Sequence, residues 1–218
     1  PTAAPTPVPS PAPTPEKLKI LCLHGGGQTA ANFQFTIQSQ TDWLNLSNYE
    51  FVFAQSPEAG SVWIKDPPGG KGTPTTSTAW AANSVNYLNN IVQTQGPFHG
   101  ILGYSQGVPM AILYLSTVAK NTFDKAFFFQ GYLPTTHTGL MSTIESAVSS
   151  GKLELPTLVF VAEQDFVFAP LAGGVISRFS NSTVVRSSSA THAFLDKSDA
   201  TYSTVTGLIS GQITFTQV

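Results

Sequence analysis

The chain has a single cysteine, few charged residues and no long apolar run. Cys22 alone cannot form an internal disulfide, and its position inside an apolar run predicts a buried, unreactive thiol. Charged residues make up 10% of the 218 positions, the net charge is −2, and lysine and arginine form no cluster. This composition argues against nucleic acid as a partner. No apolar run approaches the ~20 residues that a membrane-spanning helix requires, so no membrane span is expected.

Proline and threonine are instead concentrated at one end of the chain. Residues 1–15, "PTAAPTPVPSPAPTP", predict an extended linker or stalk with no core-forming side chains. Residues 16–218 are long enough for one sizeable domain with a full hydrophobic core. Two N-glycosylation sequons, at Asn45 and Asn181, together with the low charge favour a secreted or extracellular location over a cytoplasmic one.

Six short runs rich in β-branched and aromatic residues alternate with segments compatible with helices. Runs of this length that are apolar on both faces are typical of parallel strands covered by helices on both sides. The alternation predicts an α/β fold with a doubly wound, mostly parallel sheet of about six core strands. The expected strands are residues 18–23, 50–54, 99–104, 125–130, 157–162 and 183–187, and the expected helices are 30–46, 79–94, 107–119, 140–150, 168–180 and 197–210.

Ser105 stands between an expected strand and an expected helix, in the sequence "HGILGYSQGVPMAILYL". A sharp strand-to-helix turn brings the backbone close to the residue at its tip, which explains Gly103 and Gly107 on either side. Pro109 suits the first turn of the helix, where its missing N–H is not needed. The pattern is that of a G-x-S-x-G nucleophile elbow, although the same sequence is also compatible with a simple turn of small residues. Ser105 is therefore the candidate nucleophile.

A serine nucleophile needs a base, and in this topology the base follows the last strand and an acid follows the preceding one. His192 lies just past the last expected strand, and Asp165 lies just past the strand before it. Glu163 is the alternative acid. His24 is expected to order the loop in which it lies, whereas the other histidines have no predicted catalytic role.

The run "LCLHGGGQ", residues 21–28, predicts the second part of an acyl-transfer site. The oxyanion formed in acyl transfer needs two preorganised N–H donors, each worth roughly 3–4 kcal/mol. The backbone of Gln106, directly after the nucleophile, and that of Gly26 are the predicted oxyanion hole. The glycines are followed by no G-K-[S/T] sequence, so nucleotide binding is rejected. No ligand spacing suggests a metal site, and no cofactor is expected.

Residues 57–78 are rich in glycine and proline and predict a long surface loop. Trp63 and Ile64 are large apolar residues in this otherwise polar segment. They are the candidate substrate-binding residues, lining a pocket for an acyl chain, although burial in the core as a loop anchor is the alternative.

In these residues and their order along the chain, the sequence resembles the FSH serine hydrolase family, which consists of small α/β-hydrolases without a large cap. The resemblance extends over roughly residues 17–210 and depends on "LCLHGGGQTAANF", "YEFVFAQSP", "GPFHGILGYSQG", "FFFQGYLP" and "LPTLVFVAEQD" followed by a late histidine. It implies a triad of Ser105, Asp165 and His192 and an esterase or thioesterase acting on a small-molecule or lipid-like acyl substrate. The chain departs from the family at His99, where an acid is usual, and in "SATHAF" around His192.

Three other interpretations remain open at this point. The carboxylesterase/acyl-protein thioesterase branch has a similar "LHG…G-x-S-Q-G…D…H" skeleton. Cutinases have a similar pentapeptide, but they are stapled by disulfides that one cysteine cannot provide. A non-enzymatic binding protein built on an α/β-hydrolase shell is the third, and an intact set of Ser105, Asp165 and His192 counts against it.

Overall fold

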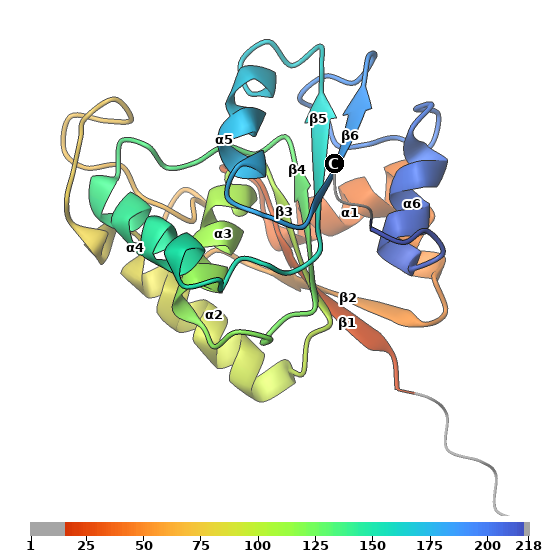
Figure 1. Cartoon of the computed structure of the whole chain (residues 1–218), viewed down its shortest axis with the longest axis horizontal. Coiled ribbons are helices and arrows are strands. Elements are labelled where there is room, and N and C mark those ends of the chain that lie inside the picture. The colour runs from red at the N-terminus through yellow and green to blue at the C-terminus, as the bar shows by residue number, and fades with distance from the viewer. Residues whose placement is uncertain (1–15, 216–218) are drawn as a thin grey trace, which may run out of the picture.

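The strands form one six-stranded sheet in which every neighbouring pair is parallel (Figure 1). The computed structural model describes residues 16–215, so the predicted stalk at 1–15 lies outside the described residues. The order in the sheet is β2-β1-β3-β4-β5-β6, which confirms the predicted parallel sheet. The strands are β1 (Leu18–Leu23), β2 (Tyr49–Ala54), β3 (Gly100–Tyr104), β4 (Lys125–Phe129), β5 (Thr157–Ala162) and β6 (Ser182–Ser187).

The strand order reverses at β1. This strand pairs with β2 on one side and with β3 on the other, so that Leu21 is opposite both Val52 and Ile101. In open α/β sheets, ligands bind beyond the carboxyl ends of the strands at such a switch point. Because β1 ends at Leu23 and β3 ends at Tyr104, the segments that begin at His24 and Ser105 meet there.

Helices cover both faces of the sheet, as the doubly wound fold requires (Figure 1). The buried side chains fall into two clusters, and alternate residues of β1 belong to each: Leu21 and Leu23 to one, Ile20 and Cys22 to the other. The first face is covered by α2 (Ala82–Gln95), α3 (Gly107–Thr117), α4 (Thr138–Ser149) and α5 (Ala172–Ile176), with the short η2 (Thr78–Ala81) and η3 (Ala169–Leu171) beside them. The second face is covered by α1 (Ala30–Gln40), η1 (Trp43–Asn45) and α6 (Tyr202–Ser210).

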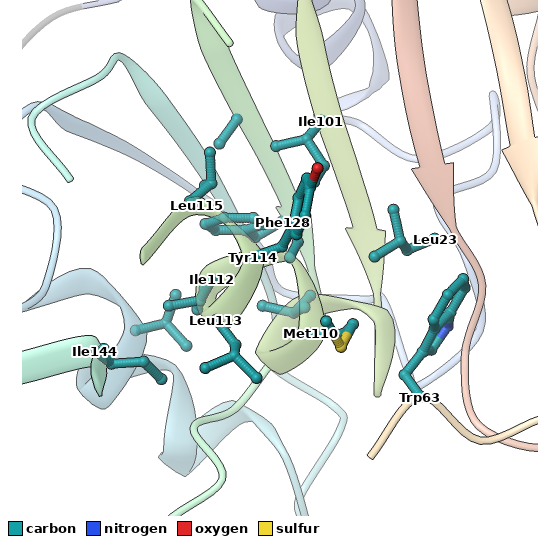
Figure 2. Close-up of a cluster of buried hydrophobic side chains, with 14 of the residues drawn as sticks. Leu23, Trp63, Ile101, Met110, Ile112, Leu113, Tyr114, Leu115, Phe128 and Ile144 are labelled. Atoms are coloured by element: carbon teal, nitrogen blue, oxygen red, sulfur yellow. The ribbon is translucent and has the colours of Figure 1, made fainter. Parts of the chain in front are cut away.

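Helix α3, which follows Ser105, is buried from Gly107 to Ser116. A helix that is apolar on all sides must be covered on all sides. Figure 2 shows its side chains between the sheet and α4, with Met110, Ile112, Leu113, Tyr114 and Leu115 packed among Leu23, Ile101, Phe128 and Ile144. The turn that holds Ser105 therefore rests on a closely packed support.

Three helices are markedly shorter than the sequence predicted. The helix expected at 30–46 ends at Gln40. The segment 168–180 forms only η3 and α5, in agreement with the low helix propensity of its Gly173-Gly174 pair. The helix expected at 197–210 begins at Tyr202. Asp196 and Asp199 accept hydrogen bonds from backbone N–H groups two residues further on, both at 2.8 Å, and such turns compete with helix formation.

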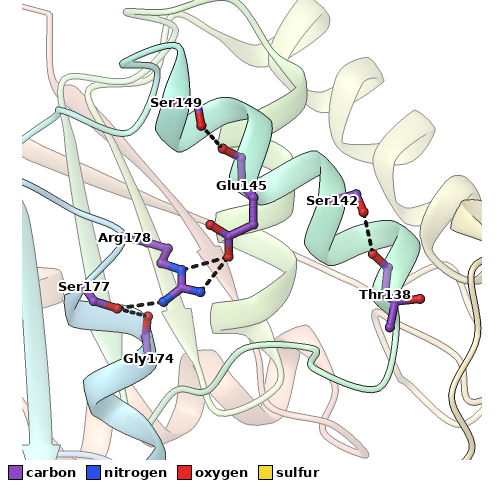
Figure 3. A network of polar contacts seen from close by, with 7 residues as sticks. All are labelled: Thr138, Ser142, Glu145, Ser149, Gly174, Ser177 and Arg178. Atoms are coloured by element: carbon purple, nitrogen blue, oxygen red, sulfur yellow. Dashed lines mark hydrogen bonds and ion pairs between the residues drawn. The ribbon is translucent and has the colours of Figure 1, made fainter.

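A polar network fixes the region of α5 against α4 (Figure 3). Arg178 donates from both Nε and Nη2 to Oε1 of Glu145, at 3.0 and 2.6 Å. Its Nη1 also donates to the hydroxyl of Ser177 at 2.8 Å. A single partly exposed ion pair contributes at most about 1 kcal/mol. Because two nitrogens of Arg178 donate to the same carboxylate oxygen, the pair nevertheless fixes the position of the segment after α5 relative to α4.

Residues 57–77 contain no helix or strand apart from an isolated bridge between Thr75 and His137, which confirms the predicted long loop. Across residues 16–215, none of the helices combines the length and the apolar character needed to cross a membrane.

Candidate active site

Ser105 occupies a strained turn between β3 and α3. Its φ of +50° lies in the left-handed region, which costs a non-glycine residue roughly 1–2 kcal/mol. A Cβ on Gly103 would lie 2.7 Å from the carbonyl oxygen of Gly107, and one on Gly107 would lie 2.2 Å from that of Leu23. Neither position tolerates a side chain, as the sequence predicted.

The structure brings Ser105, His192 and Asp165 together from the ends of β3, β6 and β5. Oγ of Ser105 is 3.0 Å from Nε2 of His192, and Nδ1 of the same ring is 2.5 Å from Oδ2 of Asp165. A carboxylate only accepts, so Nδ1 donates the proton and Nε2 is left to accept from the serine hydroxyl. The Asp165 side chain is almost fully buried, whereas that of His192 is 40% exposed. The arrangement can therefore remove a proton from Ser105 at a position that substrate can reach.

The carboxylate beside His192 is that of Asp165, while the alternative acid Glu163 is exposed. A turn after β5 directs Asp165 inward: its N–H donates to the carbonyl of Ala162 at 3.0 Å, and its Oδ1 accepts from the N–H of Phe168 at 3.2 Å. The hydrogen bond to Phe168 fixes Oδ1, and the other oxygen, Oδ2, faces the imidazole.

Three side chains for which the sequence predicted no role hold the His192 loop. The hydroxyl of Tyr104 donates to the carbonyl of His192, and Nε2 of Gln130 donates to that of Ala193 at 3.1 Å. Burial, together with the charge of Asp165, raises the pKa of Tyr104 to about 12, so its hydroxyl remains a donor at neutral pH. The ring of Phe168 stacks on the His192 imidazole with 4.4 Å between centroids.

Gly26 and Gln106, the predicted oxyanion donors, lie side by side across the switch point. A Cβ built on Gly26 would be 3.3 Å from Oε1 of Gln106. Within residues 16–215, neither backbone N–H donates to a protein acceptor. The Gln106 side chain is turned toward the loop, where Oε1 accepts from the N–H of Trp63 at 2.8 Å and Nε2 donates to the carbonyl of Ile64 at 3.3 Å.

His24 orders the turn that precedes Gly26, in agreement with the sequence interpretation. Its Nδ1 is 2.7 Å from the carbonyl of Gly25, and its Nε2 accepts from the N–H of Ser56 at 3.1 Å. A carbonyl only accepts, so the ring is the neutral tautomer with the proton on Nδ1. Burial lowers the pKa of His24, which favours the same neutral form.

A cavity of about 380 Å³ opens beside Gln106, a size typical of a small-molecule site. It lies between the 57–78 loop, the segment before α4 and the η3–α5 segment. Its apolar walls include Ile64, Pro109, Leu133 and Leu171, and its polar lining includes Tyr132, His137, Asp66 and Lys71.

Of the two residues predicted to line this pocket, Ile64 does so and Trp63 does not. Trp63 is fully buried in the core, and its indole N–H donates to the carbonyl of His24 at 2.8 Å. The packing of that ring against His24 makes Trp63 the anchor of the loop, which corrects its assignment to the pocket wall.

The two remaining histidines have hydrogen-bonding partners away from Ser105. Nε2 of His137 donates to the carbonyl of Lys65 at 2.9 Å, and Nδ1 of His99 is 2.9 Å from Asp124. Cys22 is buried, and burial raises the pKa of its thiol. Between residues 16 and 215, no three histidine, cysteine or acidic side chains are grouped so that they could hold a metal ion.

The parallel sheet, the elbow and the acid and histidine that follow later strands define an α/β-hydrolase fold. Solved structures agree: acyl-protein thioesterase 2 of Zea mays matches with a TM-score of 0.66 and 18% identity over 89% of this chain and 94% of that chain. A carboxylesterase from Mesorhizobium loti matches with a TM-score of 0.62 and 11% identity, over 89% and 87%. At these identities the likeness shows the fold alone.

The model of the serine hydrolase (FSH1) family matches residues 14–194, and the chain belongs to that family. An esterase of Drosophila melanogaster is 29% identical over 79% of this chain and 67% of its own length. An uncharacterized hydrolase of Schizosaccharomyces pombe is 27% identical over 70% of this chain. The match spans only 42% of that yeast protein.

Proposed function

We propose that the chain hydrolyses carboxylic esters or thioesters with a triad of Ser105, His192 and Asp165. The observation that carries this proposal is the hydrogen-bonded series from Oγ of Ser105 through His192 to Asp165, in a member of a serine hydrolase family. We also assign the whole of residues 16–218 to this hydrolase domain, because both core clusters and all candidate site residues fall within it.

In the first half of the reaction, Nε2 of His192 takes the proton of the Ser105 hydroxyl as Oγ attacks the carbonyl carbon. Asp165 keeps the imidazole in the Nδ1–H tautomer and stabilises the imidazolium that forms. The carbonyl oxygen becomes an oxyanion, which accepts from the N–H groups of Gly26 and Gln106. As the carbonyl re-forms, the bond to the leaving group breaks and His192 donates its proton to the departing alcohol or thiol.

The second half releases the acid. A water molecule loses a proton to His192 and attacks the carbonyl carbon of the acyl-enzyme, giving a second oxyanion on the same donors. Collapse breaks the bond to Oγ, and the proton on His192 returns to Ser105. The chemistry requires no metal or organic cofactor, because the nucleophile, base and oxyanion donors all come from the chain.

The cavity beside Gln106 is the proposed site for the acyl chain. Ile64, Leu133 and Leu171 offer it an apolar wall next to the carbonyl position. We therefore expect the substrate to be a small or lipid-like acyl ester whose apolar part lies in this cavity.

The experiment combines covalent labelling with a substrate series. A fluorophosphonate probe should label the wild-type protein and fail to label Ser105→Ala. p-Nitrophenyl acetate, butyrate and octanoate, with acyl thioesters of the same lengths, give the preferred chain and leaving group. A wild-type protein that is neither labelled nor active on any of these substrates would leave the non-enzymatic binding role as the better interpretation.

A further inference from the structure

Three large apolar side chains are exposed within six residues directly after Asp165. Phe166 is 79% exposed, Val167 68% and Leu171 47%; we call these three residues the apolar strip. The other large exposed apolar residues of the described chain, Leu18, Phe35 and Ile213, each stand alone in a separate segment. Single exposed apolar residues are ordinary, but a group of them marks an interaction surface.

One end of the apolar strip reaches the cavity of the candidate site. Leu171 is part of the strip and also part of the cavity wall. Phe168 lies between Val167 and Leu171 in the sequence. Its ring stacks on that of His192, with 4.4 Å between centroids, and contacts the ring of Tyr132, another cavity residue, with 5.3 Å between centroids. Whatever covers the strip is therefore held next to the cavity and to the ring that stacks on His192.

The segment that bears the apolar strip has no charge. No acidic or basic residue occurs from Phe166 to Ser177, and the chain as a whole has few charges and no basic cluster. Anionic lipid surfaces and charged protein surfaces are attracted by basic or complementary side chains, which this segment lacks. Its chemistry matches an uncharged apolar surface.

The exposure of the apolar strip also narrows the kinds of partner that can cover it. Phe166 and Val167 are exposed and do not line the cavity, so an acyl chain held there leaves them uncovered. A second copy of the chain is disfavoured by area: a large aromatic side chain buries at most about 250 Å², so three apolar side chains together bury less than the roughly 800 Å² per partner of a stable dimer. A soft apolar layer accommodates protruding side chains without a complementary pocket.

We propose that the apolar strip docks the protein on the surface of a neutral, zwitterionic lipid assembly, so that acyl esters pass from that surface into the cavity. The inference rests on the proposed hydrolase function, since it is the cavity beside Ser105 that gives the docked orientation its use.

The test uses the full chain, the double variant Phe166→Ser with Val167→Ser, and the matched control Phe35→Ser. Phe35 is 69% exposed, but it lies on α1, which covers the opposite face of the sheet from α5. Leu171 is left intact because it lines the cavity. Flotation with phosphatidylcholine vesicles measures docking. Hydrolysis of p-nitrophenyl decanoate within those vesicles and of p-nitrophenyl acetate in solution measures its consequence.

We expect the wild type and Phe35→Ser to float with the vesicles, and the partition of the double variant to fall by at least about tenfold. The double variant should lose activity on the vesicle-borne decanoate to a similar extent, while all three proteins hydrolyse dissolved acetate at equal rates.

Several outcomes would overturn the inference. They are absence of wild-type flotation, equal flotation of the double variant, equal losses in Phe35→Ser, or binding that appears only with anionic vesicles. A concentration-dependent dimer that the double variant abolishes, without flotation, would make a second copy the occupant. Failure of the proposed function looks different: the wild type would float as expected and yet hydrolyse neither ester.

Discussion

Ser105 shows how much of the site is determined by single residues. Its positive φ is maintained by two neighbours that cannot be larger than glycine, and the helix behind it is buried along nearly its whole length. Strain of this kind persists only where the surrounding structure over-determines it, and it is common at reactive residues. The hydroxyl is thereby held 3.0 Å from the His192 ring without help from substrate.

We expect Ser105→Ala and His192→Ala each to lower kcat by at least about 10⁴-fold, and the double variant to lose no more than either alone. The reason is that the nucleophile and its base act as one unit, so that neither contributes once the other is gone. Steady-state kinetics on one soluble ester, with thermal unfolding as a check on folding, measures this. Losses that multiply in the double variant would show that the two residues act separately.

Asp165→Asn should keep the fold and lower kcat by roughly 10⁴-fold at neutral pH. An amide at this position can donate to Nδ1 and so favours the wrong tautomer of His192. The matched control is Glu163→Gln, an exposed residue at the same strand end, which should change kcat by less than about threefold. The opposite ranking in a kcat assay would move the acid to Glu163.

Chain order and strand ends allowed Ser105, Asp165 and His192 to be predicted, because those positions depend on topology. Tyr104 and Gln130 could not be assigned in the same way. Each bonds to the backbone of the His192 loop, 88 and 63 residues further along the chain, and no local pattern shows such a contact. The only signal near Tyr104 is its position directly before the nucleophile.

At the scale of elements, the sequence predicted all six strands to within a residue at either end, because buried parallel strands are continuous apolar runs bounded by turns. The ends of helices were less predictable. The start of α6 is delayed by side chains that bond to nearby backbone, and the Gly-rich segment after Asp165 forms only short turns of helix. These outcomes depend on local competition that hydrophobic patterning does not describe.

In the 57–78 loop, Trp63 is the buried anchor and Ile64 is part of the cavity wall, so a variant at each position tests one role. Ile64→Ala removes part of the cavity wall and should raise KM for an octanoyl ester about tenfold more than KM for an acetyl ester. Trp63→Phe keeps the buried ring but loses the bond to the His24 carbonyl, so it should lower the free energy of unfolding by about 1–2 kcal/mol with no dependence of KM on acyl length.

Chain-length series for both variants, with urea unfolding, separate the two roles. Ile64 is itself nearly buried, so Ile64→Ala will also lose some stability, and the dependence on acyl length is the readout that decides. An equal rise of KM for acetyl and octanoyl esters would remove Ile64 from the acyl site. A rise of KM in Trp63→Phe that grows with acyl length would instead show that Trp63 contributes to the acyl site.

At the scale of the whole molecule, the site is assembled where several loops are joined to one another. His24 connects the turn after β1 to Ser56, and the carbonyl of His24 accepts from Trp63. The loop is joined in turn to the elbow by the Gln106 side chain. Protonation of His24 at Nε2 would turn the acceptor of the Ser56 N–H into a second donor. The hydrogen bond would be lost, so protonation of His24 destabilises the folded chain.

The pH dependence of stability should report this destabilisation. Burial lowers the pKa of His24 in the folded protein below its ordinary value of 6.5. Between the folded and unfolded pKa values the unfolded chain binds more protons, so the free energy of unfolding falls as the pH decreases through that window and is fully retained above it. His24→Gln can still accept from the Ser56 N–H through Oε1 but cannot titrate.

We therefore expect the wild type to lose more stability than His24→Gln between about pH 7.5 and pH 5.5, even though the variant starts from a lower value after losing its bond to the Gly25 carbonyl. Urea unfolding at a series of pH values, followed by tryptophan fluorescence, measures the two slopes. Because every other titrating group is common to both proteins, the difference between the slopes isolates His24. Parallel curves would mean that His24 has the same affinity for a proton in the folded and unfolded chain, and that burial does not keep its imidazole neutral.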